Sequence, residues 1–507
     1  MRIAAALCLF LAGVAFWPLW QDHLAVKWAV VFLGAAAAAV GLLRSRALRV
    51  DMVDVAALGF GVWVCLSLTW TPDPVAGRWF AVVLVAAIVC FLGARRIAPG
   101  NEAWIEGALW LAVPATIILE HFGAVSGGFG NENFQAAFYL VALPWLCTRH
   151  SWPIAVAAVV ATLTDSSKLE YPVAALLIAV WLWRKGGYWR PFTTMVTLAC
   201  LAAVITIRDT HISLFSRAET MFTTLLLWLE KPLTGQGIGS YVHEYGRLGH
   251  IYNDIMPEWF QIRGLGPVFI TSGRAHSDAL QIPMEVGLIG LIPIAYVLWR
   301  ALRAQDGHPG MYCAPQQGQE RRISSPGQVV TTPVHNAPHK RAAVSLLALF
   351  ALVLIDFPVQ QPATAFVLIA CLATLLPVEA RWTFQNRPVS QAAAATALVA
   401  LFGWGMHQSY HAMVSAYHFD DFYKRWQTQP GRAFLANAKA VEAFPAHRRF
   451  RLQLVRSLAY AHRAKRAIVD RRGIDHVYRV SASAAPYDDG VRQGRLTLLL
   501  DMQERGK

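Results

Sequence analysis

Apolar runs alternate with short polar breaks from residue 1 to about residue 408, and the remaining tail resembles ordinary soluble sequence. A helix needs about 20 apolar residues, within a range of about 17–25, to cross the hydrocarbon core of a membrane. The pattern therefore predicts an all-α polytopic membrane protein with about 12–13 transmembrane helices. The predicted spans are about 3–20, 24–43, 53–70, 79–94, 103–120, 133–148, 152–164, 171–184, 192–208, 280–302, 342–356, 363–378 and 393–408.

The distribution of Lys and Arg predicts the orientation, because cytoplasmic loops carry an excess of both. With the N-terminus inside, the short outside loops hold little beyond Arg78 and Lys168. A large loop, 209–279, and the tail, 409–507, then lie outside the cytoplasm. The inside loops hold Arg44, Arg46, Arg49, Arg95, Arg96, Arg149, Arg184, Lys185, Arg190, Arg300, Arg303, Arg321, Arg322, Lys340, Arg341, Arg381 and Arg387.

The chain is predicted to have a transmembrane domain, residues 1–408, followed by a helical periplasmic tail. We interpret residues 1–20 as an uncleaved first span, because no small-residue cleavage site precedes a second apolar run. The inside loop 304–340 is rich in Gly, Pro, Gln and Ser and is predicted to be flexible. Within the tail, FLANAKAVEAFPAHRRFRLQL weakly resembles YRVSASAAPYDDGVRQGRLTL, which fits either tetratricopeptide-like helical hairpins or a plain helical cap.

Composition supports the membrane assignment. Of the 507 residues, 56% are hydrophobic and 15% charged, against about 25% charged residues in soluble domains. The net charge of +14 lies in loops between apolar runs, so we attribute it to membrane orientation and not to nucleic-acid binding. All cysteines except Cys313 fall in apolar runs, so no disulfide framework or cysteine metal site is implied.

Ionisable residues are almost absent from the middle of the predicted spans. Lys27, Glu106 and Glu285 lie near span ends, and Asp356 lies at an outer boundary. Proton- or ion-coupled transporters usually need such groups at mid-membrane. Their scarcity argues against a transporter and directs attention to the outer surface.

Two outer segments carry polar side chains at the ends of spans. The first, GGFGNENF, combines glycines that allow tight turns with Asn131 and Asn133, whose amides suit sugar hydroxyls. It fits equally a loop-to-helix turn with Asn133 as N-cap. In the second, DSSK, Lys168 is a rare outside cation, and it either has a purpose there or belongs to an ordinary solvated turn.

Two further outer segments hold an arginine and a histidine. RAETMFTTLLLWLEKPLTGQGIGSY predicts a helix along the membrane surface that Arg217 opens and Lys231-Pro232 ends. The Arg217 guanidinium suits a diphosphate, or it contacts lipid headgroups. GRAHSDALQ enters a span, and His276 there suits a general base or a structural role.

Together these segments resemble the O-antigen ligase and O-antigen polymerase superfamily of bacterial envelope glycosyltransferases. GNENFQAAFYLVALP is similar to the family's GN-x-N-F-x-A segment, and Ser167-Lys168 to its Ser-Arg turn. Arg217 with PLTGQGIGSY is similar to the family's arginine, helix and glycine-rich turn. AHSDALQIPMEVGLIGL is similar to a His-Asn segment leading to E-x-G-L-x-G, and IDFPVQQPATAF to a late D-x-P turn. This sequence departs from the pattern at Glu132, Lys168 and Ser277, where Pro, Arg and Asn are usual.

The resemblance implies transfer of a glycan from undecaprenyl diphosphate to an acceptor hydroxyl on a lipid, glycan or protein. The site would face the periplasm from the bacterial inner (cytoplasmic) membrane. His276 would be the base, and Arg217 would stabilise charge on the diphosphate. Asp278 or Glu285 would orient His276. The expected substrate-binding residues are Lys168, Arg274, Asn131, Asn133, Asp278 and Glu285.

No metal or other cofactor is expected. The sequence has no outside Asp-x-Asp segment, P-loop, dinucleotide fingerprint or zinc spacing. A polymerase or a protein O-oligosaccharyltransferase of the same superfamily fits the same residues. A polysaccharide flippase and an inactive scaffold for glycan assembly are the alternatives from other classes.

Overall fold

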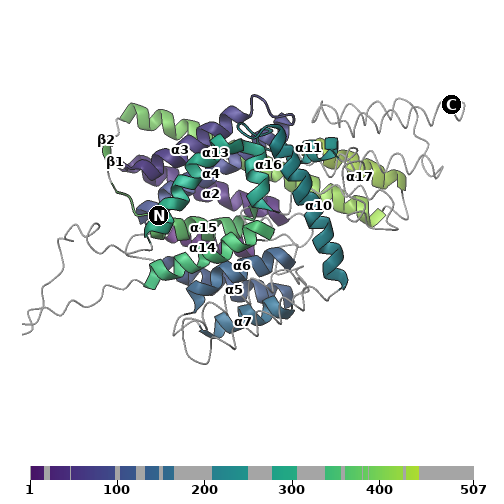
Figure 1. Cartoon of the computed structure of the whole chain (residues 1–507), viewed down its shortest axis with the longest axis horizontal. Coiled ribbons are helices and arrows are strands. Elements are labelled where there is room, and N and C mark those ends of the chain that lie inside the picture. Colours follow the sequence, from purple (N-terminus) through teal and green to yellow (C-terminus); the bar gives the residue numbers. More distant parts are fainter. Residues whose placement is uncertain are drawn as a thin grey trace, which may run out of the picture.

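The chain is mostly helical in its computed structural model (Figure 1). One bundle of packed helices makes up most of the described fold, and a helical hairpin lies beside it. The structure describes residues 2–15, 23–45, 47–97, 103–121, 132–147, 152–164, 208–248, 277–304, 337–355, 360–379, 381–385, 388–425 and 430–444.

Helices make up most of the described residues, and two short strands lie among them in the sequence. In chain order they are α1 (Arg2–Val14), α2 (His23–Arg44), β1 (Ala47–Val50), α3 (Met52–Ser67), α4 (Pro74–Ile97), α5 (Ala103–His121), α6 (Glu132–Leu146), α7 (Trp152–Thr164), α10 (Arg208–Glu230), α11 (Tyr241–Leu248), α13 (Asp278–Arg303), α14 (Ala337–Ile355), α15 (Pro362–Leu375), β2 (Trp382–Gln385), α16 (Pro388–Arg425) and α17 (Pro430–Ala443).

Each predicted span that falls within the described residues coincides with a helix. Among the described helices, four are long and apolar enough to cross a membrane: α2, α4, α5 and α13. Shorter apolar helices include α1, α3, α6 and α15. The predicted span 171–184, and all but the last residue of 192–208, lie outside the described residues. The helices support a membrane protein, and the number and direction of the crossings stay predictions.

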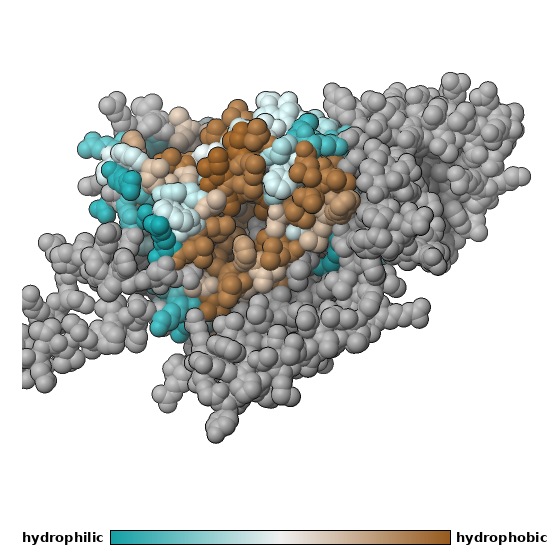
Figure 2. All heavy atoms as spheres, viewed as in Figure 1, coloured by the Kyte–Doolittle hydropathy of each residue, from teal (hydrophilic) through white to brown (hydrophobic). Residues whose placement is uncertain are grey.

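The centre of the bundle is one buried apolar cluster to which α1 to α7 and α13 to α16 all contribute. Small residues let the helices approach closely, as membrane helices commonly do. A Cβ added to Gly13 of α1 would lie 3.3 Å from Ala112 Cβ of α5. On the outside, large apolar side chains face away from the protein, including Ile292 at 67% and Val399 at 65% exposure. Figure 2 shows a broad apolar face bordered by hydrophilic residues, which suits contact with lipid.

A buried ion cluster joins α3 to α4 at the end predicted to face the cytoplasm. The Arg95 guanidinium donates to Asp51 at 2.6 and 3.0 Å and also to Asp54. Its Nε donates to the Leu376 carbonyl at 2.7 Å, and Arg96 pairs with Asp54 at 2.9 Å. The Arg95 side chain is fully buried. A buried arginine requires such partners because an unpaired charge would be costly to desolvate.

Two short strands beside this cluster correct the all-α prediction. β1 and β2 pair antiparallel, with Ala47 opposite Gln385 and Val50 opposite Trp382. Asp51 ends the first strand because its side chain accepts hydrogen bonds from the first amides of α3. The residues of the two strands lie far apart in the sequence, so hydrophobic periodicity could not pair them.

Helix α10 corrects the predicted start of the surface helix. It begins at Arg208 and not at Arg217, which lies in its middle. Five of the eight residues between 208 and 217 are polar, and none is Gly or Pro, so nothing in the sequence stops the helix from starting earlier. The predicted end before Pro232 agrees with the structure.

The tail begins as a continuation of the last apolar helix. α16 runs unbroken for 38 residues across the predicted boundary at 408. α17 packs along it, and Ser415 Oγ donates to the Ala440 carbonyl at 2.6 Å. The Phe444 ring then meets Trp79 of α4 edge-on, with centroids 5.7 Å apart. The first part of the tail is therefore a helical hairpin attached to the bundle.

Helix α14 makes a smaller correction to the predicted flexible loop 304–340. The helix begins at Ala337, so the last residues of that segment are helical. Lys340 and Arg341 lie in its first turns, and Arg341 pairs with Glu106 of α5 at 3.1 Å. Residues 305–336 lie outside the described residues.

Candidate functional site

The backbone of α13 is interrupted at Gly287, one of the glycines in the E-x-G-L-x-G segment. Gly287 has φ 67° and ψ 179°, which no helix can accommodate. In a continuous helix, Leu288 would donate to Met284 and Ile289 to Glu285. The kink leaves these two amides and two carbonyls without their helical partners, and buried backbone groups need others in their place.

The glycine-rich loop after α10 supplies all four partners. Two of its carbonyls accept from the freed amides, and two of its amides donate to the freed carbonyls. We call this unit, residues 232–240 with 284–289, the glycine joint. The bonds run from Leu288 N to Pro232 O (2.9 Å), from Ile289 N to Leu233 O (3.1 Å), from Gln236 N to Met284 O (2.8 Å) and from Gly237 N to Glu285 O (2.9 Å).

Glycine is required where the two backbone segments of the joint touch. Gly235 has φ 72°, in the left-handed region that side chains other than glycine rarely adopt. A Cβ at Gly235 would lie 2.5 Å from the Glu285 carbonyl oxygen. A Cβ at Gly287 would overlap the Leu233 carbonyl oxygen. Gly235 and Gly287, one from each motif, therefore serve one purpose, which is close pairing of the two backbone segments.

The end of α3 and the turn after it hold the joint from the other side. Trp63 Nε1 donates to the Val286 carbonyl at 2.7 Å. Thr71 Oγ1 donates to the Ile238 carbonyl at 2.9 Å, and Ile238 N donates to Ser67 Oγ at 3.2 Å. Three segments that are distant in sequence are thus fixed together by hydrogen bonds.

A chain of buried polar side chains extends from the joint toward the start of α13. Glu285 Oε2 accepts from Gly239 N at 3.0 Å, and Glu285 Oε1 accepts from Gln281 Nε2 at 2.9 Å. Gln360 Nε2 donates to Gln281 Oε1 at 3.1 Å and to Asp278 Oδ1 at 2.7 Å. Asp278, Gln281 and Glu285 lie on one helix face at spacings of three and four residues and are all buried.

These contacts determine what two of the predicted site residues do. Glu285 uses both carboxylate oxygens to hold the loop and Gln281, so it positions the joint. Asp278 lies in the first turn of α13, where a negative charge also suits the helix dipole. Ser277 Oγ donates to the Val353 carbonyl at 3.3 Å, which ties the same turn to α14. The backbone directly after His276 is therefore firmly held.

Arg217 is buried on α10, which packs against α13. Its side chain shares a helix face with Thr220, Thr224 and Leu227, at offsets of three, seven and ten residues. Only 8% of Arg217 is exposed. Leu227 packs in a cluster with Met284 of the joint. Such burial fits an interior role better than contact with headgroups.

The structure leaves the remaining predicted residues undescribed. Asn131, Lys168, Arg274 and His276 lie outside the described residues. Asn133 is the second residue of α6, and its side chain is not described. The structure therefore brings Asp278 and Glu285 into one network and buries Arg217 on the neighbouring helix, and it does not test the others.

The sequence interpretation missed the glutamines that link the carboxylates. Gln281 was available as a signal, because it falls three residues after Asp278 and four before Glu285. Gln360 offered no such signal, because it belongs to a distant turn that directly precedes α15. No protein-family model matches the chain, and no curated protein matches it either.

Proposed function

We propose that this chain is a membrane glycosyltransferase that moves a glycan from undecaprenyl diphosphate to an acceptor hydroxyl on the periplasmic face. The observation that supports the proposal is the convergence of three segments that carry the resemblance. The glycine-rich turn, the E-x-G segment of α13 and the turn at Gln360 form one buried, hydrogen-bonded unit. A common site built from these three segments requires them to meet in this way.

The proposed reaction is a single displacement. The acceptor oxygen bonds to the anomeric carbon, and the bond from that carbon to the diphosphate oxygen breaks. His276 takes the acceptor proton, and undecaprenyl diphosphate leaves with the bonding electron pair. A buried cation is needed where that negative charge develops, and Arg217 provides it with Lys168 and Arg274.

The remaining residues have supporting roles in this proposal. Asn131 and Asn133 hydrogen-bond sugar hydroxyls, which both donate and accept. Asp278 and Glu285 hold the start of α13 and the glycine-rich loop in place. A polymerase and a protein O-oligosaccharyltransferase would use the same chemistry on a different acceptor, so the acceptor must be found by experiment.

A reconstituted assay tests the proposal. The purified protein is mixed with undecaprenyl-diphosphate-linked glycan and envelope acceptors in a chelator, and release of undecaprenyl diphosphate is measured. We expect release by the wild-type protein and a loss of about 100-fold or more for Arg217→Ala. Arg78→Ala is the matched control, because Arg78 is exposed at the start of α4. Equal turnover by both variants would show that Arg217 is not part of the site. No release of undecaprenyl diphosphate by the wild-type protein would contradict the proposal.

A further inference from the structure

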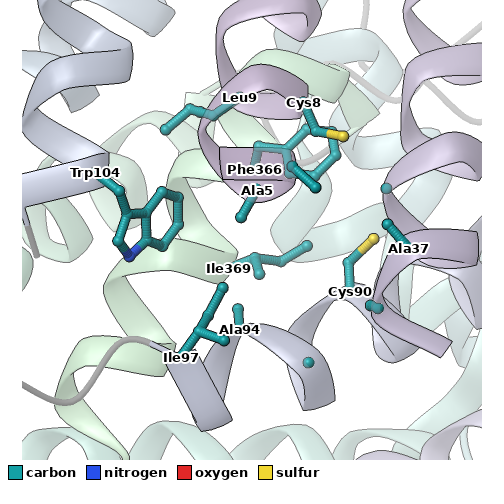
Figure 3. A pocket seen from close by; sticks show the side chains of 14 residues that line it. Ala5, Cys8, Leu9, Ala37, Cys90, Ala94, Ile97, Trp104, Phe366 and Ile369 are labelled. Carbon is teal, nitrogen blue, oxygen red and sulfur yellow. The ribbon is translucent and has the colours of Figure 1, made fainter. Parts of the chain in front are cut away.

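An apolar cavity lies between α1, α2, α4, α5 and α15, away from the glycine joint (Figure 3). Its interior volume is about 50 Å³, and the cavity opens to the outside of the protein. Gly77 of α4 would touch the joint if it carried a Cβ, whereas the cavity residue Cys90 lies more than three turns later on the same helix. At a rise of about 1.5 Å per residue, the cavity lies roughly 20 Å further along the helix.

Small residues leave this space open. Ala5, Ala37 and Ala94 line it from three different helices, with Cys8 and Cys90 between them. Helices in a protein interior normally interdigitate with few voids larger than a water molecule. A cavity with apolar walls does not hold water well, because water needs two to four polar partners. The fitting occupant is therefore itself apolar, such as a hydrocarbon chain.

One polar atom at this cavity indicates that the hydrocarbon chain belongs to a lipid with a polar group at its end. Trp104 lines the cavity, and its Nε1 is buried with no hydrogen-bond partner among the described residues. Figure 3 shows its ring beside the cavity, with the nitrogen on the edge nearest Ile97 in that view. Trp104 is the second residue of α5, so it lies at a helix end. Tryptophans at such interfaces bury the ring and donate from the indole to polar lipid atoms.

Two arginines at the same end of the bundle indicate the charge of that lipid. Arg2 comes two residues before Ala4, which lines the cavity, and Arg44 follows Ala38 by about 9 Å along α2. Both side chains are exposed, and neither forms an ion pair with the described residues. The charge pattern assigns this end to the cytoplasm. At the cytoplasmic end of the bundle, basic side chains beside a cavity between helices suit the phosphate of an anionic lipid.

We propose that the cavity holds part of one acyl chain of an anionic phospholipid from the cytoplasmic leaflet. Trp104 Nε1 donates to an ester carbonyl of the lipid, and Arg2 and Arg44 meet its phosphate. This site is independent of the proposed glycosyl transfer, because the two lie at different levels of the bundle. It would fix the packing of α1, α2, α4, α5 and α15 around a bound lipid.

Native mass spectrometry of the purified full-length protein tests this site. The protein is reconstituted with equal amounts of phosphatidylglycerol and phosphatidylethanolamine, re-extracted, and its retained lipid is measured. We expect one phosphatidylglycerol per chain. Ala37→Leu should fill the cavity and lower retention about tenfold, and Trp104→Phe should lower it several-fold while keeping an aromatic ring. Ala397→Leu is the control, because Ala397 is exposed on α16, away from the cavity.

The outcomes separate clearly. Wild-type retention in both Ala37→Leu and Trp104→Phe would overturn the site, and so would equal retention of the two lipids by the wild-type protein. Thermal melting of each variant shows whether it is folded. If Ala37→Leu fails to fold, Trp104→Phe alone decides, because it removes only the donor and part of the ring.

Discussion

Gly287 is the residue on which the glycine joint depends. Its positive φ turns the backbone of α13, and the four groups freed by the turn find partners in the loop 232–237. The sequence showed the motif but not its purpose, since nothing in a glycine-rich turn indicates the segment with which it pairs.

We predict that Gly287→Ala destabilises the protein. A residue with a Cβ is strained at this φ and would overlap the Leu233 carbonyl, so a loss of about 3 kcal/mol or more is expected. Thermal melting of the detergent-purified protein measures it. Gly107→Ala on α5 is the matched control, because a Cβ there meets nothing within 4 Å. Equal melting temperatures for the two variants would show that the joint is not needed.

The role of His276 rests on the sequence, because His276 lies outside the described residues, which resume at Ser277. We predict that His276→Ala lowers transfer by about 100- to 10,000-fold, because a general base contributes that much. Protein level in the membrane and melting temperature should stay unchanged. His339→Ala, at an exposed position of α14, is the control. Near-normal transfer by His276→Ala would remove it as the base.

At the scale of elements, the sequence predicted the helices well. Long apolar runs locate a membrane helix directly, and the helices from α2 to α7 begin and end close to the predicted spans. The predicted start of α10 was wrong because polar and apolar residues are mixed in its first turns, so no apolar run marked them. Strands β1 and β2 were missed because pairing between segments near opposite ends of the predicted transmembrane domain leaves no local pattern.

The ion cluster at Arg95 also escaped the sequence interpretation. The positive-inside rule explained Arg95 and Arg96 as loop charges that orient the protein. In the structure Arg95 is buried, and it holds α3, α4 and the segment after α15 together. A cation count cannot distinguish a charge that faces water from one that has a partner inside the protein.

We predict a pH dependence for this cluster. Burial acts to raise the pKa of Asp51, but hydrogen bonds from Arg95 and from backbone amides outweigh it and hold the pKa below its usual 3.8. A carboxylate with a lowered pKa contributes stability above about pH 3.8, and that contribution is lost as pH falls through the folded-state value. Asp51→Asn should therefore melt well below the wild type from pH 8 to 5.

The difference between the two melting temperatures should shrink once the pH falls below about 4, because protonated Asp51 then resembles Asn. Melting curves at half-unit pH steps measure this. A difference that stays constant from pH 8 to pH 3 would show that the charge of Asp51 contributes nothing to stability.

At the scale of the whole molecule, the joint and the ion cluster lie at opposite ends of α3. Ser67, at the C-terminal end of α3, contacts the joint, and Asp51 caps its N-terminal end. If α3 crosses the membrane, the candidate site and the cluster face different compartments. The charge asymmetry of the loops predicts that the cluster faces the cytoplasm and that the site faces the periplasm.

We predict that a cysteine at Lys231, an exposed position beside the joint, reacts with a membrane-impermeant maleimide in intact cells. Arg44→Cys, exposed at the cytoplasmic end of α2, should react only after the cells are permeabilised. The unsubstituted protein measures the background from the natural cysteines. The reverse pattern of labelling would show that the protein has the opposite orientation in the membrane.

The central claim is a glycan transfer from a lipid carrier, and the glycans left on undecaprenyl diphosphate in a strain lacking this gene test it most directly. The account predicts that lipid-linked glycan accumulates outside the cytoplasm and disappears when the wild-type gene is restored. Full-length polymer on the carrier would identify a ligase, and single repeat units would identify a polymerase. An unchanged pool of lipid-linked glycan would contradict the proposed function.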